Sequence, residues 1–194
     1  MSSRDTNLRV VLLYGLLYGA IAAFAATASS VGLVAADLKI GSPAFADRGK
    51  MPAKYSCDGE GLNPPLTFSN VPAKTQSLAL IVEDPDIPEQ FKAQIPSGVF
   101  DHWLIWDIAA DSKGFAEGGE KGGINAGGRP GFFPACPPDK SHRYFFKLFA
   151  LDKKLTGVDI KNKADLQAAM AGHIIQQAEM IGMYGPAAGG GRGR

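Results

Sequence analysis

The sequence predicts a mainly β protein built from short strands, and two observations predict this fold class. The first is a high content of turn-forming residues, 24 glycines and 13 prolines in 194 residues, without a repeat. The second is their placement, because turns such as Gly41-Ser42-Pro43, Asn63-Pro64-Pro65 and Asp84-Pro85-Asp86 separate short apolar runs. Short strands between frequent turns are typical of β-rich folds rather than helical bundles.

Three apolar segments are expected to form the main strands. Ser77–Glu83 is almost continuously hydrophobic, as expected of a strand that is covered on both faces. His102–Ile108 alternates between two faces, and Arg143–Asp152 is a third strand with Tyr144 on one of its faces. His142 shares the face of Tyr144 if this third strand begins one residue earlier.

One helix is predicted near the C-terminus. Asn162 is a suitable N-cap for a helix that runs to about Met180. Its apolar positions recur at helical steps and would pack it against the sheets: Leu166, Met170, Ile174, Ala178 and Ile181. The glycine-rich stretch Asp111–Pro138 is expected to be a long loop, and a loop of this length is usually functional or disordered. Residues 187–194 are predicted to form a flexible Gly/Arg tail.

The charge balance excludes two classes of protein. Twenty Lys and Arg residues against 19 Asp and Glu residues leave a formal charge of +1. Nucleic-acid binding as the main function needs clustered basic residues, so the balance excludes it. The same balance excludes a chain that is kept disordered by its charge.

Residues 1–36 are predicted to be a signal peptide. Arg4 and Arg9 precede a charge-free run, Val10–Ala36, that ends in small residues. The alternative is an uncleaved membrane anchor, because about 18 apolar residues can span a bilayer. Only in that case would the protein be attached to a membrane. Either interpretation places the domain, residues 37–186, outside the cytoplasm, in the periplasm or secreted.

Export bears on the only two cysteines, Cys57 and Cys136. An even number of cysteines in an oxidising compartment favours one disulfide between them. The alternative is a nucleophilic Cys136 that is activated by His142. The two interpretations differ in whether Cys136 carries a free thiol.

Several residues that could do chemistry lie at the ends of the predicted strands. The turn Asp84-Pro85-Asp86-Ile87-Pro88 follows the first strand. Its prolines fix their own φ and restrict the preceding residues, so both carboxylates are expected on a stiff, extended turn. His102 begins the second strand, and His142 and Tyr144 begin the third. In a sheet these ends could converge on one pocket.

A series of motifs extends in order through about residues 38–184. They are Ser42-Pro43-Ala44-Phe45, Tyr55-Ser56-Cys57-Asp58-Gly59, Asn63-Pro64-Pro65-Leu66, Asp84-Pro85-Asp86-Ile87-Pro88, His102-Trp103, Gly123-Ile124-Asn125, Cys136-Pro137-Pro138, His142-Arg143-Tyr144, Ala150-Leu151-Asp152 and Ala171-Gly172-His173-Ile174. This series resembles the phosphatidylethanolamine-binding protein family, in particular its bacterial Raf-kinase-inhibitor-like branch. The resemblance implies two packed antiparallel sheets with a small C-terminal helical part. It also implies a shallow pocket for a phosphate-type head group or another small anion.

The resemblance implies a set of ligand-binding residues, with no metal and no cofactor. Carried over position by position, the set is Asp84, Asp86, His102, Pro138, His142 and Tyr144. Asp84 would orient a histidine or accept a hydrogen bond from a ligand amine. His102 and His142 would hold phosphate oxygens, and Tyr144 would add a hydroxyl donor. Arg143 alternates to the other face of its strand, where it is expected to pair with an acidic residue.

Two positions depart from the pattern of this bacterial branch. Phe133-Pro134-Ala135 stands before Cys136 where the branch usually has Gly-Gly-Pro. The rim is therefore bulkier and stiffer, and its backbone amides are less available to an anion. Phe100, two residues before the pocket histidine, has no indole donor. Both changes bear on which ligand the pocket prefers.

The expected function is that of an exported, non-enzymatic binding protein for a small anionic or phosphate-bearing ligand. It would also regulate a protein partner such as a protease or a kinase. One alternative is a metal-dependent enzyme that uses His102, His142 and a carboxylate of Asp84 or Asp86. Another is a structural or adhesion domain in which the motif residues only brace the long loop.

Overall fold

A computed structural model describes residues 36–95, 97–126 and 129–186. Residues 1–35 of the predicted signal peptide or anchor, and the predicted tail 187–194, lie outside the described residues. Within the described ranges, no helix has both the length and the apolar character that a membrane crossing requires.

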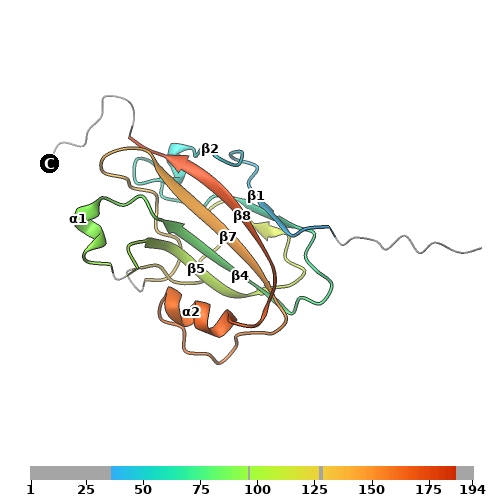
Figure 1. Cartoon of the computed structure of the whole chain (residues 1–194). Helices are drawn as coiled ribbons and strands as arrows, with labels where there is room; N and C mark the ends of the chain where they lie inside the picture. Colours follow the sequence, from blue (N-terminus) through green and yellow to red (C-terminus); the bar gives the residue numbers. More distant parts are fainter. Residues whose placement is uncertain (1–35, 96, 127–128, 187–194) are drawn as a thin grey trace, which may run out of the picture. The chain divides into compact units, whose positions relative to one another are not determined.

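The described residues form two packed β-sheets (Figure 1). The smaller sheet has three strands in the order β1 (Lys39–Gly41), β3 (Leu66–Ser69) and β6 (Gly114–Phe115). The larger sheet has five strands in the order β2 (Gly49–Lys50), β8 (Ile174–Tyr184), β7 (His142–Leu151), β4 (Ser77–Asp84) and β5 (Phe100–Ala109). All strand pairs are antiparallel except β2 with β8. The helices are η1 (Ala53–Tyr55), α1 (Glu89–Lys92) and α2 (Lys163–Met170). This arrangement confirms the predicted fold class.

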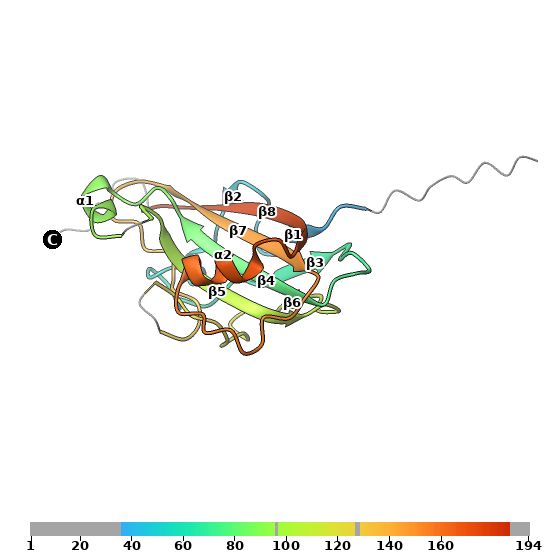
Figure 2. The same cartoon turned by 60° about the horizontal axis from the view of Figure 1, so that its bottom comes forward.

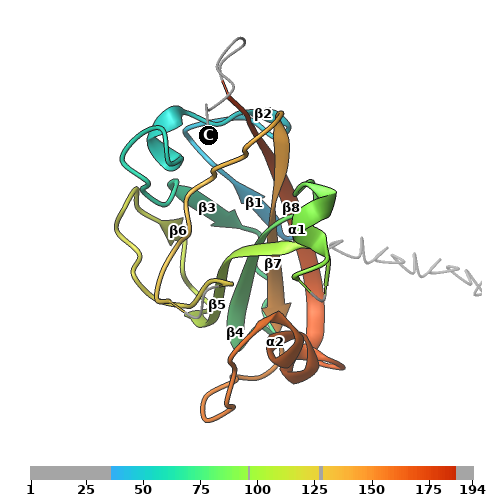
Figure 3. The ribbon, with the colours of Figure 1, turned by 90° about the vertical axis from the view of Figure 1, so that its left-hand side faces the viewer.

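Strand β4, in the interior of the larger sheet between β7 and β5, is buried on both faces, as its continuous hydrophobic run predicts. Leu78, Leu80 and Val82 face the core that lies between the two sheets. Figure 3 shows the ribbons of the two sheets on the two sides of this core. The other face is covered by α2 and the loop before it (Figure 2). The cluster on that second face consists of Ala79, Ile81, Leu104, Phe149, Leu151, Leu155, Ile160, Leu166 and Met170. Burial on both faces holds the end of β4 firmly in place.

The start of the predicted C-terminal helix is confirmed, but its second half is wrong. Asn162 does cap α2, because its side chain accepts a hydrogen bond from the Asp165 amide at 3.0 Å. The helix ends at Met170, however, and the chain from Ile174 onward is strand β8, paired with β7 along its length. Gly172 has a φ of +78°, a left-handed conformation that ends a helix. The apolar repeat continues by coincidence into a strand that is stabilised by pairing with β7.

The glycine-rich stretch Asp111–Pro138, predicted as a loop, is hydrogen-bonded to β5 over part of its length. Ile124 exchanges two backbone hydrogen bonds with Leu104, at 2.7 and 2.9 Å. Gly123 makes this approach possible, since a Cβ there would lie 2.2 Å from the Leu104 carbonyl oxygen. The stretch also contains the short strand β6. The end of the stretch lies beside the start of β5, where the Phe133 amide donates to the His102 carbonyl at 2.8 Å.

Candidate ligand-binding site

A cavity of about 480 Å³ lies where β4 ends and where β5 and β7 begin. These ends meet because β4 pairs antiparallel with both neighbours, so that Asp84 is opposite Phe100 and Glu83 is opposite Phe145. Four buried side chains give the cavity its polar part: Asp84, His102, His142 and Tyr144. The other lining residues are Ile87, Pro88, Phe91, Gln94, Ile95, Phe100, Phe133, Cys136 and Pro138. The cavity therefore combines a small cluster of titratable side chains with a mostly apolar wall.

His142 lies between two carboxylates. Its Nδ1 is 2.7 Å from Oδ2 of Asp84, and its Nε2 is 2.9 Å from Oδ1 of Asp139. Burial opposes the positive charge, but the hydrogen bonds with Asp84 and Asp139 outweigh burial and raise the pKa of His142. Both ring nitrogens face acceptors, so both donate in the charged imidazolium form. The rigid turn after β4 supports this pair, because the Asp86 amide donates to Asp84 Oδ1 at 2.8 Å.

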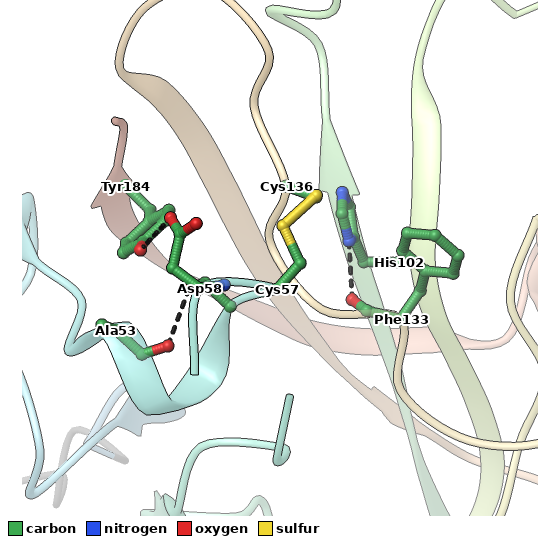
Figure 4. The surroundings of a disulfide bond; sticks show 8 residues. Ala53, Cys57, Asp58, His102, Phe133, Cys136 and Tyr184 are labelled. Atoms are coloured by element: carbon green, nitrogen blue, oxygen red, sulfur yellow. Dashed lines mark hydrogen bonds between the residues drawn. A yellow bond between two sulfur atoms is a disulfide. The ribbon is translucent and has the colours of Figure 1, made fainter. Parts of the chain in front are cut away.

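His102 has the opposite character. Its Nδ1 lies 2.7 Å from the carbonyl oxygen of Phe133, to which it donates (Figure 4). Burial lowers the pKa of His102 to about 4, so the ring is neutral at pH 7. With the proton on Nδ1, Nε2 is an acceptor that points away from Phe133. His102 thus offers an acceptor to a ligand, in place of the donor expected from the sequence.

Tyr144 contributes a buried hydroxyl that is free to donate. The residue is 1% exposed, and its hydroxyl proton has no acceptor among the described residues. Burial raises the pKa of this phenol, so it remains protonated and can donate. Its ring packs edge-on against His102, with 5.0 Å between ring centroids. A buried hydroxyl left unsatisfied costs about 1–3 kcal/mol, which a ligand in the cavity could recover.

Asp86 is the predicted site residue that the structure does not bring to the cavity lining. Its carboxylate accepts two hydrogen bonds from the Arg143 side chain, at 2.6 and 2.7 Å, and one from the Arg143 amide at 3.0 Å. Arg143 thus has the acidic partner expected of it. The other five predicted residues, Asp84, His102, Pro138, His142 and Tyr144, all line the cavity.

The Asp86–Arg143 pair predicts a pH dependence of stability. The hydrogen bonds from Arg143 lower the pKa of Asp86 from 3.8 to about 2. The stabilisation is therefore complete above about pH 4 and is lost as the pH falls toward 2, because the unfolded carboxylate takes up its proton first. We expect Asp86→Asn to cost about 1–2 kcal/mol at pH 7, allowing for the exposure of Arg143.

Urea unfolding of wild type and Asp86→Asn at pH 7, 4 and 2.5 measures this dependence. The difference in free energy of unfolding should shrink only in the acid range. Asp159→Asn is the matched control, because Asp159 pairs with Lys161 and both side chains are more than two-thirds exposed, at 77% and 73%. A difference that stays constant down to pH 2.5 would contradict the assignment.

A disulfide joins Cys57, which follows η1, to Cys136 on the cavity rim (Figure 4). The Cys57 amide also donates to the Ala135 carbonyl at 3.0 Å, so two links tie this rim to the segment around η1. Nearby, the Tyr184 hydroxyl donates to Asp58 at 2.7 Å. The expected Cys57–Cys136 pairing is present. The alternative of a nucleophilic Cys136 thiol is not supported, because its sulfur is bonded.

Comparisons with known proteins identify the family. A family model described as "Phosphatidylethanolamine-binding protein" matches residues 41–185. The chain belongs to the phosphatidylethanolamine-binding protein family. A UPF0098 protein of Chlamydia pneumoniae is 47% identical over 146 residues, which cover 74% of this chain and 95% of the relative. Another, from Methanothermobacter thermautotrophicus, is 42% identical over 150 residues, covering 73% and 94% of the two chains.

Two solved structures of this family share the fold. The homologue CT736 of Chlamydia trachomatis is 40% identical, with a TM-score of 0.72 over 78% of this chain and 99% of that chain. YbcL of E. coli, described as a new member of the mammalian family, is 27% identical. It has a TM-score of 0.66 over 78% of this chain and 100% of its own. The predicted family and fold are thereby confirmed.

Sequence reasoning missed two parts of this family site. Asp139 contacts His142, yet in the sequence it is an aspartate next to a lysine in a proline-rich turn, with no periodic signal. The apolar wall from the segment after Asp86, carried partly by Phe91 of α1, was also missed. Its apolar residues Ile87, Phe91 and Ile95 recur every four positions, which could have indicated one shared face. Only the fold shows that this face borders the histidines.

Proposed function

We propose that this protein binds a small anionic, phosphate-bearing ligand in the cavity at the ends of β4, β5 and β7. The observation that carries the proposal is the buried hydroxyl of Tyr144, whose proton has no acceptor among the described residues and which lines the cavity together with His142. Buried polar groups are normally paired, so a donor left free in a cavity is a feature of a binding site. The membership in the phosphatidylethanolamine-binding family supports the same ligand class.

Each polar group would have a distinct part in holding the ligand. The charge on His142 would balance the charge of a phosphate, and the Tyr144 hydroxyl would donate to one of its oxygens. Nε2 of His102 would accept from a protonated phosphate oxygen or from an ammonium group on the ligand. The wall that includes Ile87, Phe91 and Phe100 would pack against an apolar part of the ligand. The site therefore suits a phosphate monoester with a short organic substituent.

The proposal is one of binding without catalysis. A two-histidine metal site would require a free nitrogen on each ring; His102 has Nε2, but both nitrogens of His142 already face carboxylates. No group of three or more His, Cys, Asp or Glu side chains that could hold a metal ion occurs in the part of the chain that the structure describes. The free-thiol alternative has no support, because Cys136 is bonded to Cys57. The arrangement favours a pocket that holds a ligand in place.

Export to the periplasm or outside the cell is the second part of the proposal. It is supported by the charge-free run Val10–Ala36 and by the disulfide, since disulfides persist in oxidising compartments. Sequencing the amino terminus of the protein isolated from cells tests it. A mature chain that starts near residue 37 supports cleavage, and an intact start in the membrane fraction indicates an anchor. An intact start in the cytoplasmic fraction would contradict export.

Regulation of a protease or kinase is the third part. A partner would contact the cavity edge, where Phe91 is 43% exposed and adjoins the apolar part of the lining. An inhibition assay on purified proteases and kinases, with and without phosphoethanolamine, tests this part. Inhibition that changes when the cavity is filled would support it. No inhibition at micromolar protein would contradict it.

The binding proposal predicts stabilisation of the folded protein by phosphate compounds. At a ligand concentration of about 100 times Kd, linkage raises the free energy of unfolding by about 2.7 kcal/mol. We expect inorganic phosphate or phosphoethanolamine to raise the Tm of the wild type and not that of His142→Ala, which lacks the cation. His173→Ala is the matched control, because His173 pairs with Asp152 in an exposed position and should leave the shift unchanged.

The same thermal screen can overturn the proposal. If neither phosphate compound shifts the Tm, while zinc or iron raises it in a way that EDTA abolishes, the metal-dependent alternative is favoured. If His142→Ala responds to phosphate as the wild type does, the anion binds elsewhere.

A further inference from the structure

The two carboxylates that hold His142 differ in how freely they can move. The side chain of Asp84 is 4% exposed, and it is also fixed through its second oxygen by the Asp86 amide. The side chain of Asp139 is 45% exposed and comes from the loop between the disulfide and β7. Pro137 and Pro138 stiffen the backbone before it, so its side chain can turn away without moving the rim. Asp139 is the partner that a ligand could displace.

The charges around the cavity explain why displacement would be needed. None of the described lining residues is a lysine or an arginine, and Arg143 is committed to Asp86. His142 is therefore the lining residue that can carry a positive charge, and it faces two carboxylates. An anion that enters while both carboxylates remain in place meets an excess of negative charge and finds no free donor on His142. Of the two ring nitrogens, only Nε2 can lose its carboxylate partner at a small cost in free energy, because that partner, Asp139, is 45% exposed.

We propose that Asp139 is an internal competitor of the ligand: its carboxylate occupies the position at His142 Nε2 that an anionic oxygen of the ligand takes. This inference rests on the proposed function. The loop aspartate sets the specificity of the site, because a ligand must bind His142 better than a tethered carboxylate does. Weakly basic anions such as chloride are excluded, whereas phosphate monoesters, with several strongly accepting oxygens, displace Asp139.

The test compares phosphate binding by the wild type, Asp139→Asn and Asp139→Ala, measured by calorimetric titration at constant ionic strength. The titration is run at pH 6, where burial keeps His102 neutral and Asp84 still faces Nδ1 of His142 after Asp139 is replaced. We expect both variants to bind inorganic phosphate about fivefold more tightly than the wild type, the fold-change that corresponds to the loss of one half-exposed ion pair.

Asp152→Asn is the matched control, because it also removes a half-exposed carboxylate from a histidine, His173, at the other end of β7. Its phosphate affinity should equal that of the wild type. Suppose that the wild type binds phosphate, that His142→Ala does not, and that both Asp139 variants bind it equally well or more weakly than the wild type. This result overturns the competitor role of Asp139 and leaves the proposed function standing. No binding by the wild type or by either Asp139 variant overturns the proposed function itself. Binding by the variants alone supports the competitor role most directly.

Discussion

Replacement of Lys163 by methionine is expected to lower the free energy of unfolding by about 3–5 kcal/mol. Lys163 opens helix α2, and its side chain is 10% exposed. Its Nζ lies 2.8 Å from Glu83 and 2.6 Å from Asp101, the residues next to Asp84 and His102. Methionine would keep the volume of the side chain but leave two carboxylates without their shared cation.

The pKa values in this cluster show why the loss is large. Burial opposes the charge on Glu83, but hydrogen bonds from Lys147 and Lys163 outweigh burial and lower its pKa. Burial raises the pKa of Asp101 even with Lys163 beside it. Without Lys163, Asp101 would be a largely buried acid with no compensating charge at that position, a state that is strongly destabilising.

Chemical denaturation of the folded domain measures the effect, and Lys161→Met provides the control. Lys161 lies two residues earlier in the chain and pairs with Asp159 in an exposed position, so its replacement should change stability by about 0.5 kcal/mol or less. If both variants lose a similar, small amount of free energy of unfolding, the ion pairs of Lys163 with Glu83 and Asp101 contribute no more than an exposed ion pair.

Removal of the disulfide is the second large effect. The double replacement Cys57→Ser, Cys136→Ser opens a cross-link between residues 79 positions apart. In the chain-entropy description this costs about 4 kcal/mol, because the unfolded chain gains freedom. Phosphate affinity should fall as well, since Cys136 lines the cavity and the adjacent rim carries Pro138.

The comparison uses oxidised wild type, wild type reduced with a phosphine, and the double serine variant. Reduction and substitution should give the same loss of stability if the cross-link is its cause. Mass spectrometry checks the redox state, because the oxidised protein is lighter by about two hydrogens. An unchanged midpoint of unfolding in both reduced and substituted protein would contradict the prediction.

The strand predictions succeeded and the helix prediction failed in part for the same reason. A continuous apolar run such as Ser77–Glu83 is a local property, and it specified β4 within one residue. The helical repeat from Leu166 to Ile181 was also local, but Gly172 interrupts it and β7 offers a hydrogen-bonding edge to the residues that follow. Pairing over so many residues outweighs a weak helical preference.

The candidate site likewise has a part that the sequence indicates and a part that depends on tertiary contacts. Asp84, His102 and His142 are indicated by residue type and by their positions at strand ends. The sequence does not show that Asp86 is bound by Arg143, or that Phe133 fixes the proton of His102 on Nδ1. These roles depend on contacts between residues that are 57 and 31 positions apart. Asp139 acquires its role only because the rim loop turns back onto His142.

By itself, the sequence determined the β-rich fold class, the resemblance to the family and the strand-end residues from which a pocket could be built, and it favoured a disulfide without excluding a free thiol. These follow from residue types and short-range spacing, which are read directly along the chain. The tertiary structure alone decided the opposite pKa shifts of the two pocket histidines. Burial lowers the pKa of His102, whereas hydrogen bonds with two carboxylates outweigh burial and raise the pKa of His142. Burial and charge act through space, so residues distant in sequence decide them.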